Sequence, residues 1–328
     1  MVKITITKNE EYQRLDRFLK KYLKNAPLSY IYKVIRKDLK VNGKRVREDS
    51  VLCDGDEITL YMDQEELDGY LKSKTVSKGR KQFKVAYEDH NIIIVEKPFG
   101  LLTHGDSIEK KNTLTNQVQG YLMAKGEYDP AGEKTFVPSP ANRLDRNTTG
   151  LVIFGKNAAA LSALNKMIRE RDYVSKFYLT IVSGELKKPM ILKDLMEKDT
   201  DINKVTVRPI NAAGAKGKVM ETMVDPVVVG RGYTLVEVKL VTGRTHQIRA
   251  HLAKIGYPVI GDSKYGKPAV NKEMEHKYGL TTQLLHAERL TFENGAEPLQ
   301  YLKGKEVSAD LPEDFEKIKN DIFPKGGK

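Results

Sequence analysis

A single carboxylate stands between two guanidinium groups in the stretch ANRLDRNTTG, residues 141–150. Asp145 lies two residues after Arg143 and directly before Arg146, and the apolar run LVIF follows Gly150. An ionised carboxylate can attack an anomeric carbon or stabilise the positive charge that develops on a sugar as its bond to a base breaks. Asp145 is therefore a candidate for such chemistry, although from this stretch alone a turn or cap role beside Thr148 and Thr149 is the preferred interpretation.

No second carboxylate stands out beside the first, and no cofactor motif accompanies it. A hydrolase would want another carboxylate to activate water, whereas a reaction without water would need only one. The chain contains neither GxGxxG after a strand nor GxxxxGK[ST], and His246 and His251 are five residues apart, which is not the spacing of a HExxH zinc helix. We therefore expect neither a metal nor an organic cofactor.

The charge balance favours a polyanionic partner. The 328 residues include 56 Lys and Arg against 44 Asp and Glu, a formal net charge of +12, and nucleic acid is the usual partner of such a field. Cys53 is the only cysteine, which excludes a disulfide framework and indicates a reducing compartment. No apolar run approaches the length of a membrane span, so we expect a cytoplasmic protein, and a monomer because nothing demands a dimer.

The periodicity of apolar residues predicts two domains. Residues 1–62 read as a small α/β domain, and residues 63–81 lack apolar periodicity and read as a linker. In residues 82–324, strand-like runs such as KFYLTIVSG and YTLVEVKLVTG outnumber helical stretches and do not alternate regularly with them. This pattern favours an α+β domain with a mixed, mostly antiparallel sheet.

The N-terminal residues carry an ordered set of basic and turn motifs. A helical stretch begins with Arg14-Leu15-Asp16, a second basic helix follows over residues 29–39, and VNGK and Gly55-Asp56 come later. This order resembles the S-four-like RNA-binding domain, which implies that the segment binds RNA and that Asp16 is a structural charge. The basic residues expected to contact RNA are Lys33, Arg36, Lys37, Lys44 and Arg45.

Four stretches of the large domain resemble the RluA/RluC/RluD-type pseudouridine synthases. They are EKPFGLLTHG, ANRLDRNTTG, KFYLTIVSG and TGRTHQIRAHLAKIGYPVIGDSKYG, and with the N-terminal domain the resemblance covers nearly the whole chain. It implies the pseudouridine synthase fold and the isomerisation of selected uridines to pseudouridine, with large-subunit ribosomal RNA as the expected substrate.

The resemblance also implies roles for individual residues. Asp145 is expected to be the nucleophile, Arg244 to form an ion pair with it, Tyr178 to stack on the uracil, and Arg143 to enter the RNA when the target base leaves its stack. The remaining residues that we expect to contact phosphate are Arg146, Lys176 and Arg249.

The chain departs from the family pattern at two positions beside the carboxylate. Asn142 stands where the family has His, and Thr149 stands where it has Ser. We expect these differences to affect RNA contacts rather than the carboxylate. Two other functions are compatible with the sequence: a catalytically silent RNA-binding ribosome-assembly factor, and a carboxylate-dependent nucleosidase or glycosidase.

Overall fold

The structure, a computed structural model, describes residues 1–71, 80–199, 204–211 and 217–324. Its N-terminal part is a three-stranded antiparallel sheet in the order β1-β3-β2 with helices packed against it. Its elements are β1 (Val2–Thr5), α1 (Leu15–Tyr22), α2 (Leu28–Lys37), β2 (Leu39–Val41), β3 (Glu57–Leu60) and α3 (Gln64–Tyr70).

The helices of this part form where the apolar spacing predicts them. Leu15, Phe18 and Leu19 of α1 are buried against Ile31 and Val34 of α2, one turn apart on each helix. The predicted turn at VNGK is also present. Asn42 and Gly43 both have positive φ, 50° and 76°, as a two-residue hairpin turn requires.

The range 63–81, expected to be a linker, begins with a helix instead. The side chain of Asp63 caps α3 by accepting the Glu66 N–H at 2.7 Å, and Leu67 is buried in the N-terminal core. Residues 64–70 therefore belong to the N-terminal unit, because one apolar side chain and a good cap suffice for a short helix that packs on a preformed core. Residues 72–79 of the expected linker lie outside the described residues.

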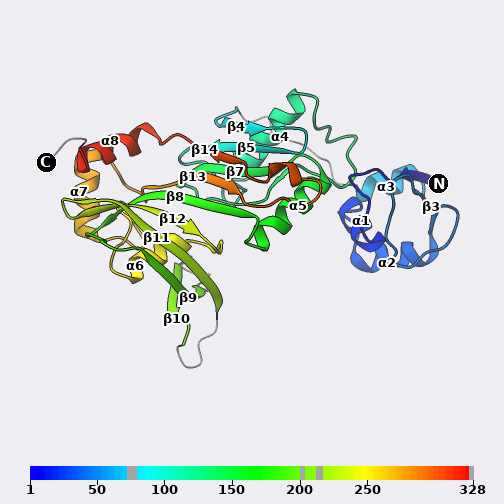
Figure 1. The fold of residues 1–328 in the computed structure, drawn as a ribbon. Coiled ribbons are helices and arrows are strands. Elements are labelled where there is room, and N and C mark those ends of the chain that lie inside the picture. Colours follow the sequence, from blue (N-terminus) through cyan, green and yellow to red (C-terminus); the bar gives the residue numbers. More distant parts are fainter. Residues whose placement is uncertain (72–79, 200–203, 212–216, 325–328) are drawn as a thin grey trace.

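The second part of the chain contains one large sheet flanked by helices (Figure 1). Its strands are β4 (Lys84–Glu88), β5 (Ile92–Lys97), β6 (Ser139–Pro140), β7 (Thr149–Gly155), β8 (Val174–Ser183), β9 (Met190–Asp199), β10 (Lys204–Pro209), β11 (Lys218–Gly230), β12 (Tyr233–Leu240), β13 (Leu285–Phe292) and β14 (Glu306–Ser308). Its helices are α4 (Leu114–Ala124), α5 (Ala158–Arg169), α6 (Gln247–Lys254), α7 (Pro268–Tyr278), α8 (Glu313–Ile322) and a 3-10 turn at Gln300–Leu302.

The sheet is mixed and mostly antiparallel, as the sequence predicted. The strand order is β10-β9-β11-β12-β8-β13-β7-β5-β4, with β14 beside β13 and β6 beside β7. Within the described strands the only parallel pair is β13 with β7, where Ala287 lies opposite Gly150. A Cβ on Gly150, whose φ is 106°, would lie 2.1 Å from the carbonyl oxygen of Ala287. Glycine is therefore required where β7 begins against β13, directly after the loop that carries Asp145.

The two parts contact each other through a polar interface (Figure 1). Asn9, in the loop between β1 and α1, donates from Nδ2 to Glu133 at 2.7 Å and accepts the N–H of Ala158, the first residue of α5, at 3.1 Å. Gln13 lies 3.5 Å from the Thr135 hydroxyl. The N-terminal unit thus docks beside α5. None of the helices in the described ranges has the length and apolar character to cross a bilayer.

Candidate active site

The backbone on both sides of Asp145 is fixed by buried side chains. Asp145 lies in the loop between β6 and β7. The Thr103 hydroxyl accepts the Leu144 N–H at 3.2 Å and lies 3.1 Å from the Leu144 carbonyl. Lys97 Nζ donates to the carbonyl of Arg146 at 2.8 Å. These contacts fix the place of the Asp145 carboxyl group, whose side chain remains 28% exposed.

Lys97, at the end of β5, braces this loop and does not face the solvent. Its side chain is 1% exposed, and Nζ also donates to the carbonyls of Pro98 at 3.0 Å and Leu101 at 2.8 Å. Burial lowers the pKa of Lys97 to about 7, against the opposing effect of the negative charge of Asp145. The lysine of EKPFG therefore has a structural role that joins two loops.

The guanidinium group that contacts Asp145 belongs to Arg249 on α6. Arg249 Nη1 donates to Asp145 Oδ2 at 3.0 Å, and the residue is 4% exposed. Its Nε and Nη2 donate to the two carboxylate oxygens of Asp262 at 2.7 and 2.8 Å. Its Cζ atom lies 5.4 Å from the ring centre of Tyr265. The bidentate pair fixes the orientation of the guanidinium group and leaves Nη1 directed at Asp145.

Asp262 is the fully buried partner on the far side of Arg249. Its Oδ1 accepts the backbone N–H groups of Lys264 at 2.9 Å and Tyr265 at 3.1 Å. Burial alone would raise the pKa of Asp262, but the hydrogen bonds and charge of Arg249 outweigh burial and lower it. Asp262 is therefore ionised at neutral pH, and one cation is shared by two carboxylates.

The prediction that Arg244 forms the ion pair with Asp145 is wrong, because Arg249 forms it and also binds Asp262. That Arg249 contacts phosphate stays a prediction. Arg244 is half-buried in the loop before α6, where its backbone N–H donates to Gln247 at 3.1 Å. Among the described residues its buried Nε has no hydrogen-bond partner.

The start of α6 explains this error. Helix α6 begins at Gln247, after His246 turns the chain in a left-handed conformation with φ 53°, so Arg249 lies on the helix and Arg244 lies in the loop before it. Gln247 Oε1 accepts from both the Arg244 N–H and the Thr242 hydroxyl, which fixes the loop. One usable signal was Asp262 in the apolar stretch YPVIGD, because a buried carboxylate needs a cationic partner.

Tyr178 on β8 lies in the core beneath the site. It is 5% exposed, and burial, followed by the negative charge of Asp145, raises its pKa. The phenol therefore lies within the electrostatic field of Asp145, and it stays protonated at neutral pH. Its hydroxyl can donate a hydrogen bond but cannot act as a strong base.

Lys176 lies two residues before Tyr178 on the same face of β8. It is 6% exposed, and burial, with a smaller effect from the charge of Arg171, lowers its pKa to about 8. Within the described ranges no carboxylate forms an ion pair with Lys176, and a phosphate that bound there would raise its pKa again.

The two arginines that flank Asp145 in the sequence lie at the surface. Arg143 is exposed, and its charge adds to the effect of burial in lowering the pKa of His104. Arg146 forms an ion pair with Asp106 at 3.1 Å, with both side chains nearly half exposed. An exposed pair of this kind contributes at most about 1 kcal/mol, so a phosphate can replace Asp106 at little cost.

Asn142 and Thr149, the two residues that depart from the family pattern, make contacts with β7 and with the neighbouring strand β13. Asn142 Oδ1 accepts the Ile153 N–H at 2.8 Å, and the Thr149 hydroxyl lies 2.7 Å from His286 Nδ1. Burial lowers the pKa of His286 to about 4, so that imidazole is neutral. Asn142 and Thr149 therefore support β7 from both sides.

Comparisons with known proteins identify the family. The model of the RNA pseudouridylate synthase family matches residues 91–254. An uncharacterized RNA pseudouridine synthase of Mycoplasma capricolum is 32% identical over 94% of this chain and 97% of its own length. The ribosomal large subunit pseudouridine synthase C of Escherichia coli K12 is 30% identical over 88% of each chain.

The fold agrees with this similarity. The structure of human RNA Pseudouridylate Synthase Domain Containing 4 is 21% identical and superposes with a TM-score of 0.56 over 73% of this chain and 92% of the human one. The chain thus has the pseudouridine synthase fold and belongs to the RNA pseudouridylate synthase family. It is an enzyme of the type that isomerises uridine to pseudouridine, as the four motifs predicted.

The two arginines of TGRTHQIR provide a test of the site. Replacing Arg249 with Met leaves the buried Asp262 carboxylate without its cation, so we expect the free energy of unfolding to fall by about 3–5 kcal/mol. Arg244→Met removes a half-buried side chain without a carboxylate partner and should cost less than about 1 kcal/mol. Urea unfolding of both variants measures the difference.

A double variant separates lost charge pairing from lost packing. Arg249→Met combined with Asp262→Leu should recover much of the stability that Arg249→Met loses, because no unpaired charge remains buried. Equal losses in Arg249→Met and Arg244→Met, or no recovery in the double variant, would contradict the assignment of Arg249 as the buried ion-pair partner.

Proposed function

We propose that this chain isomerises uridines in large-subunit ribosomal RNA and that Asp145 is the carboxylate that acts on the ribose. The substrate follows from the similarity to the Escherichia coli enzyme, whose name specifies the ribosomal large subunit. Action on ribosomal RNA would place the protein in the cytoplasm. The observation that carries the role of Asp145 is its partly exposed carboxylate, held by a buried guanidinium group that is itself anchored by Asp262.

The reaction needs few chemical groups. The bond between N1 of uracil and C1′ of the ribose breaks, the base turns, and C5 bonds to C1′. C5 then loses its proton and N1 gains one, so the product is an isomer of the substrate. A carboxylate stabilises the positive charge on the ribose, either as an ion pair or by forming a bond to the sugar. Because base and sugar remain on the enzyme and no water attacks, a second catalytic carboxylate is not needed.

The remaining residues are assigned to binding the nucleotide. Tyr178 would pack against the uracil and donate its hydroxyl proton, and Arg143 would occupy the space that the extruded base leaves in the RNA. Lys176 and Arg146 would contact phosphates. Arg244 is also a candidate for an RNA contact, because its buried Nε has no partner among the described residues.

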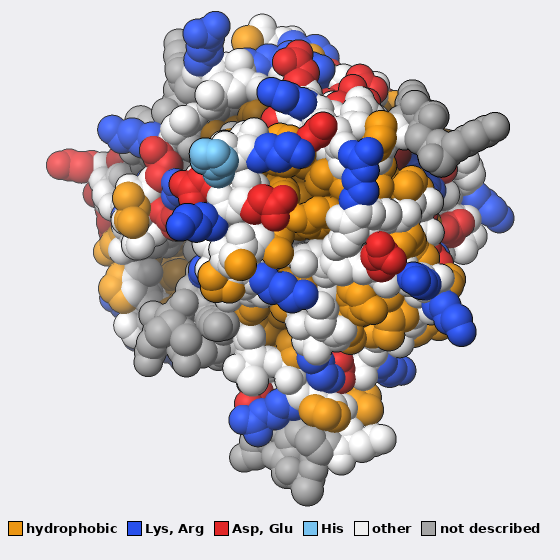
Figure 2. Space-filling view, turned by 90° about the vertical axis from the view of Figure 1, so that its left-hand side faces the viewer, with side chains coloured by type: hydrophobic (Ala, Val, Ile, Leu, Met, Phe, Trp, Pro, Cys, Tyr) orange, Lys and Arg blue, Asp and Glu red, His pale blue; other side chains and the backbone are white. Residues whose placement is uncertain are grey.

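We further propose that the N-terminal unit is an RNA-binding domain. Lys33, Arg36 and Lys37 project from α2 and are exposed, as are Lys44 and Arg45 just after the Asn42-Gly43 turn. These cations gather on a unit of about 70 residues. On the face of the molecule in Figure 2, by contrast, basic side chains are spread among acidic ones around a central group of apolar side chains.

Asp145→Asn tests the catalytic assignment. The amide keeps the shape of the carboxyl group but cannot attack or stabilise the cationic ribose. We expect pseudouridine formation, measured as tritium release from RNA labelled at C5 of uridine, to fall by roughly 10³-fold or more. Affinity for the RNA should change by less than about threefold. Full activity would overturn the assignment.

Lys176 predicts a pH dependence of RNA binding. In the free protein its pKa is about 8, and a bound phosphate would raise it. The contribution to affinity is then complete below pH 8 and is lost as pH rises above it. We expect the dissociation constant for a large-subunit ribosomal RNA transcript to rise up to about tenfold between pH 7 and 9.

Two variants isolate this effect. Lys176→Arg stays charged and should bind with little change over the same pH range. Lys176→Met should bind weakly at both pH values. The exposed Lys187→Met is the matched control and should behave like the unaltered protein. A steep pH dependence that persists in Lys176→Met would assign the titration to another group.

The basic surface of α2 predicts a change in salt dependence. If Lys33, Arg36 and Lys37 each contact a phosphate, their replacement with Gln removes about two to three units from the slope of log affinity against log salt concentration. Equal charge removal at the exposed residues Lys187, Lys188 and Lys272 is the control. The same slope change in both triple variants would contradict a specific role for the N-terminal unit.

A further inference from the structure

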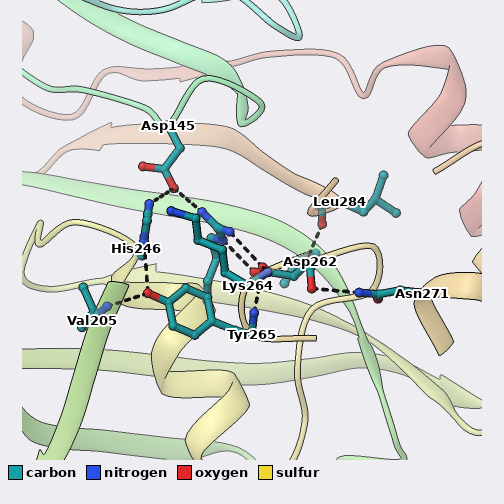
Figure 3. Close-up of polar contacts among 10 residues, drawn as sticks. Asp145, Val205, His246, Asp262, Lys264, Tyr265, Asn271 and Leu284 are labelled. Atoms are coloured by element: carbon teal, nitrogen blue, oxygen red, sulfur yellow. Dashed lines mark hydrogen bonds and ion pairs between the residues drawn. The ribbon is translucent and has the colours of Figure 1, made fainter. Parts of the chain in front are cut away.

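A histidine faces the same carboxylate oxygen as Arg249. His246 lies in the turn before α6, and its Nε2 is 3.9 Å from Asp145 Oδ2. Its other ring nitrogen, Nδ1, is 3.1 Å from the hydroxyl of Tyr265, and that hydroxyl accepts the backbone N–H of Val205 at 2.8 Å. Figure 3 shows this line of contacts running from β10 through Tyr265 and His246 to Asp145.

We propose that His246 is a positioning residue for Asp145: a neutral imidazole that directs an Nε2–H at the carboxylate while Nδ1 accepts a hydrogen bond from Tyr265. The proposal rests on the proposed function of Asp145 and adds a second donor to it. His246 would act through Asp145 and not on the RNA directly.

The hydrogen-bonding capacity of each group determines where the imidazole proton lies. A carboxylate only accepts hydrogen bonds, so a neutral imidazole that faces it must present its N–H group there. Nδ1 is then the acceptor, and the Tyr265 hydroxyl is the group placed to donate to it. Each contact from the Val205 N–H to the Asp145 carboxylate then pairs one donor with one acceptor.

Burial favours the neutral form of this imidazole. Burial lowers the pKa of His246, the negative charge of Asp145 opposes that effect, and smaller effects come from the positive charges of Arg249 and Lys264 and the negative charge of Asp262. A neutral donor suits this place because Arg249 already supplies one full positive charge. A second one would favour an ion pair that holds the carboxylate away from the ribose.

Two features concern the separation between His246 and Asp145. At 3.9 Å the N to O distance is too long for a hydrogen bond, but catalytic hydrogen bonds are often long before substrate binds and shorten once it does. His246 is also held with φ 53°, which is unfavourable for a residue with a side chain of this size. The edge-on packing of its ring against Tyr265, with centroids 5.8 Å apart, holds it there.

The tautomer can be measured without RNA. In the full-length protein labelled with ¹⁵N-histidine, long-range ¹H–¹⁵N spectra distinguish the two neutral forms, and the His246 signals are those lost in His246→Gln. We expect a protonated Nε2 and an unprotonated Nδ1 at neutral pH, and a mixture of forms in Tyr265→Phe. A protonated Nδ1 in the unaltered protein, or no change in Tyr265→Phe, would overturn the proposal.

Two substitutions of His246 distinguish a role that depends on the position of the N–H donor from a purely structural role. The amide nitrogen of Gln can reach the place of Nε2, whereas that of Asn reaches only the place of Nδ1. Asn tolerates the left-handed backbone better than Gln, so a purely structural role would favour Asn. We expect His246→Asn to lower kcat by about tenfold with unchanged RNA affinity, and His246→Gln to recover most of that loss. The reverse order would contradict the proposal.

Tyr265 should act only through His246. Tyr265→Phe keeps the ring near Arg249 and removes the hydroxyl, so we expect a lower kcat that does not fall further when Tyr265→Phe is added to His246→Asn. Additive losses would contradict the coupling. The exposed His276→Gln on α7 is the control and should leave kcat unchanged.

Failure of the proposal can be distinguished from failure of the proposed function. If the unaltered protein releases no tritium from a large-subunit ribosomal RNA transcript, the assigned substrate or reaction is wrong. The spectrum of the free protein still decides whether His246 presents Nε2–H to Asp145. If the transcript is modified but the spectrum shows Nδ1–H, only the role of His246 is rejected.

Discussion

The site depends on one buried guanidinium group shared by two carboxylates. Arg249 is held on one side by the bidentate contact with the fully buried Asp262 and presents its third nitrogen to the partly exposed Asp145. Placing an arginine in the interior is costly unless its donors are satisfied, and Asp262 satisfies two of them. The reactive carboxylate thus obtains a fixed, charged partner without being buried itself, and it remains open to a nucleotide.

The rest of the fold supplies the parts of this arrangement from distant segments. β5 contributes Lys97, which binds the backbone beside Asp145, and the close parallel contact of β7 with β13 at Gly150 fixes where the loop ends. α6 and the segment after it contribute Arg249, Asp262 and Tyr265. The ion-pair network of Asp145, Arg249 and Asp262 therefore forms only when β7, α6 and the segment after α6 have come together.

Much of this could be predicted from the sequence. Alternating apolar runs predicted the mixed, mostly antiparallel sheet, and Asn42-Gly43 predicted a tight turn, because both depend on local patterns. Asp145 was recognisable as the carboxylate that stands between two arginines in ANRLDRNTTG, although its role stays a prediction. Helix α3 was not recognised because a seven-residue helix with one buried leucine has no detectable periodicity.

The identity of the ion-pair partner could not be predicted from spacing alone. Arg244 and Arg249 lie five residues apart in one motif, and which of them faces Asp145 depends on where α6 begins and on the left-handed turn at His246. The contacts of Asp262 and Tyr265 join residues that are far from Asp145 in the sequence, and only the folded chain shows that they meet at one guanidinium group. Local patterns therefore identified the elements, and tertiary contacts decided which side chains meet.

The central claim is that the Asp145 carboxylate meets the ribose of an extruded uridine. A structure of the full chain bound to a ribosomal RNA fragment in which 5-fluorouridine replaces uridine would test it most directly. We expect C1′ of one extruded nucleotide to lie within about 3.5 Å of the Asp145 carboxylate, with the Arg249 contact retained. An extruded nucleotide whose ribose lies against a different carboxylate, or a bound RNA with no nucleotide entering beside Asp145, would contradict it.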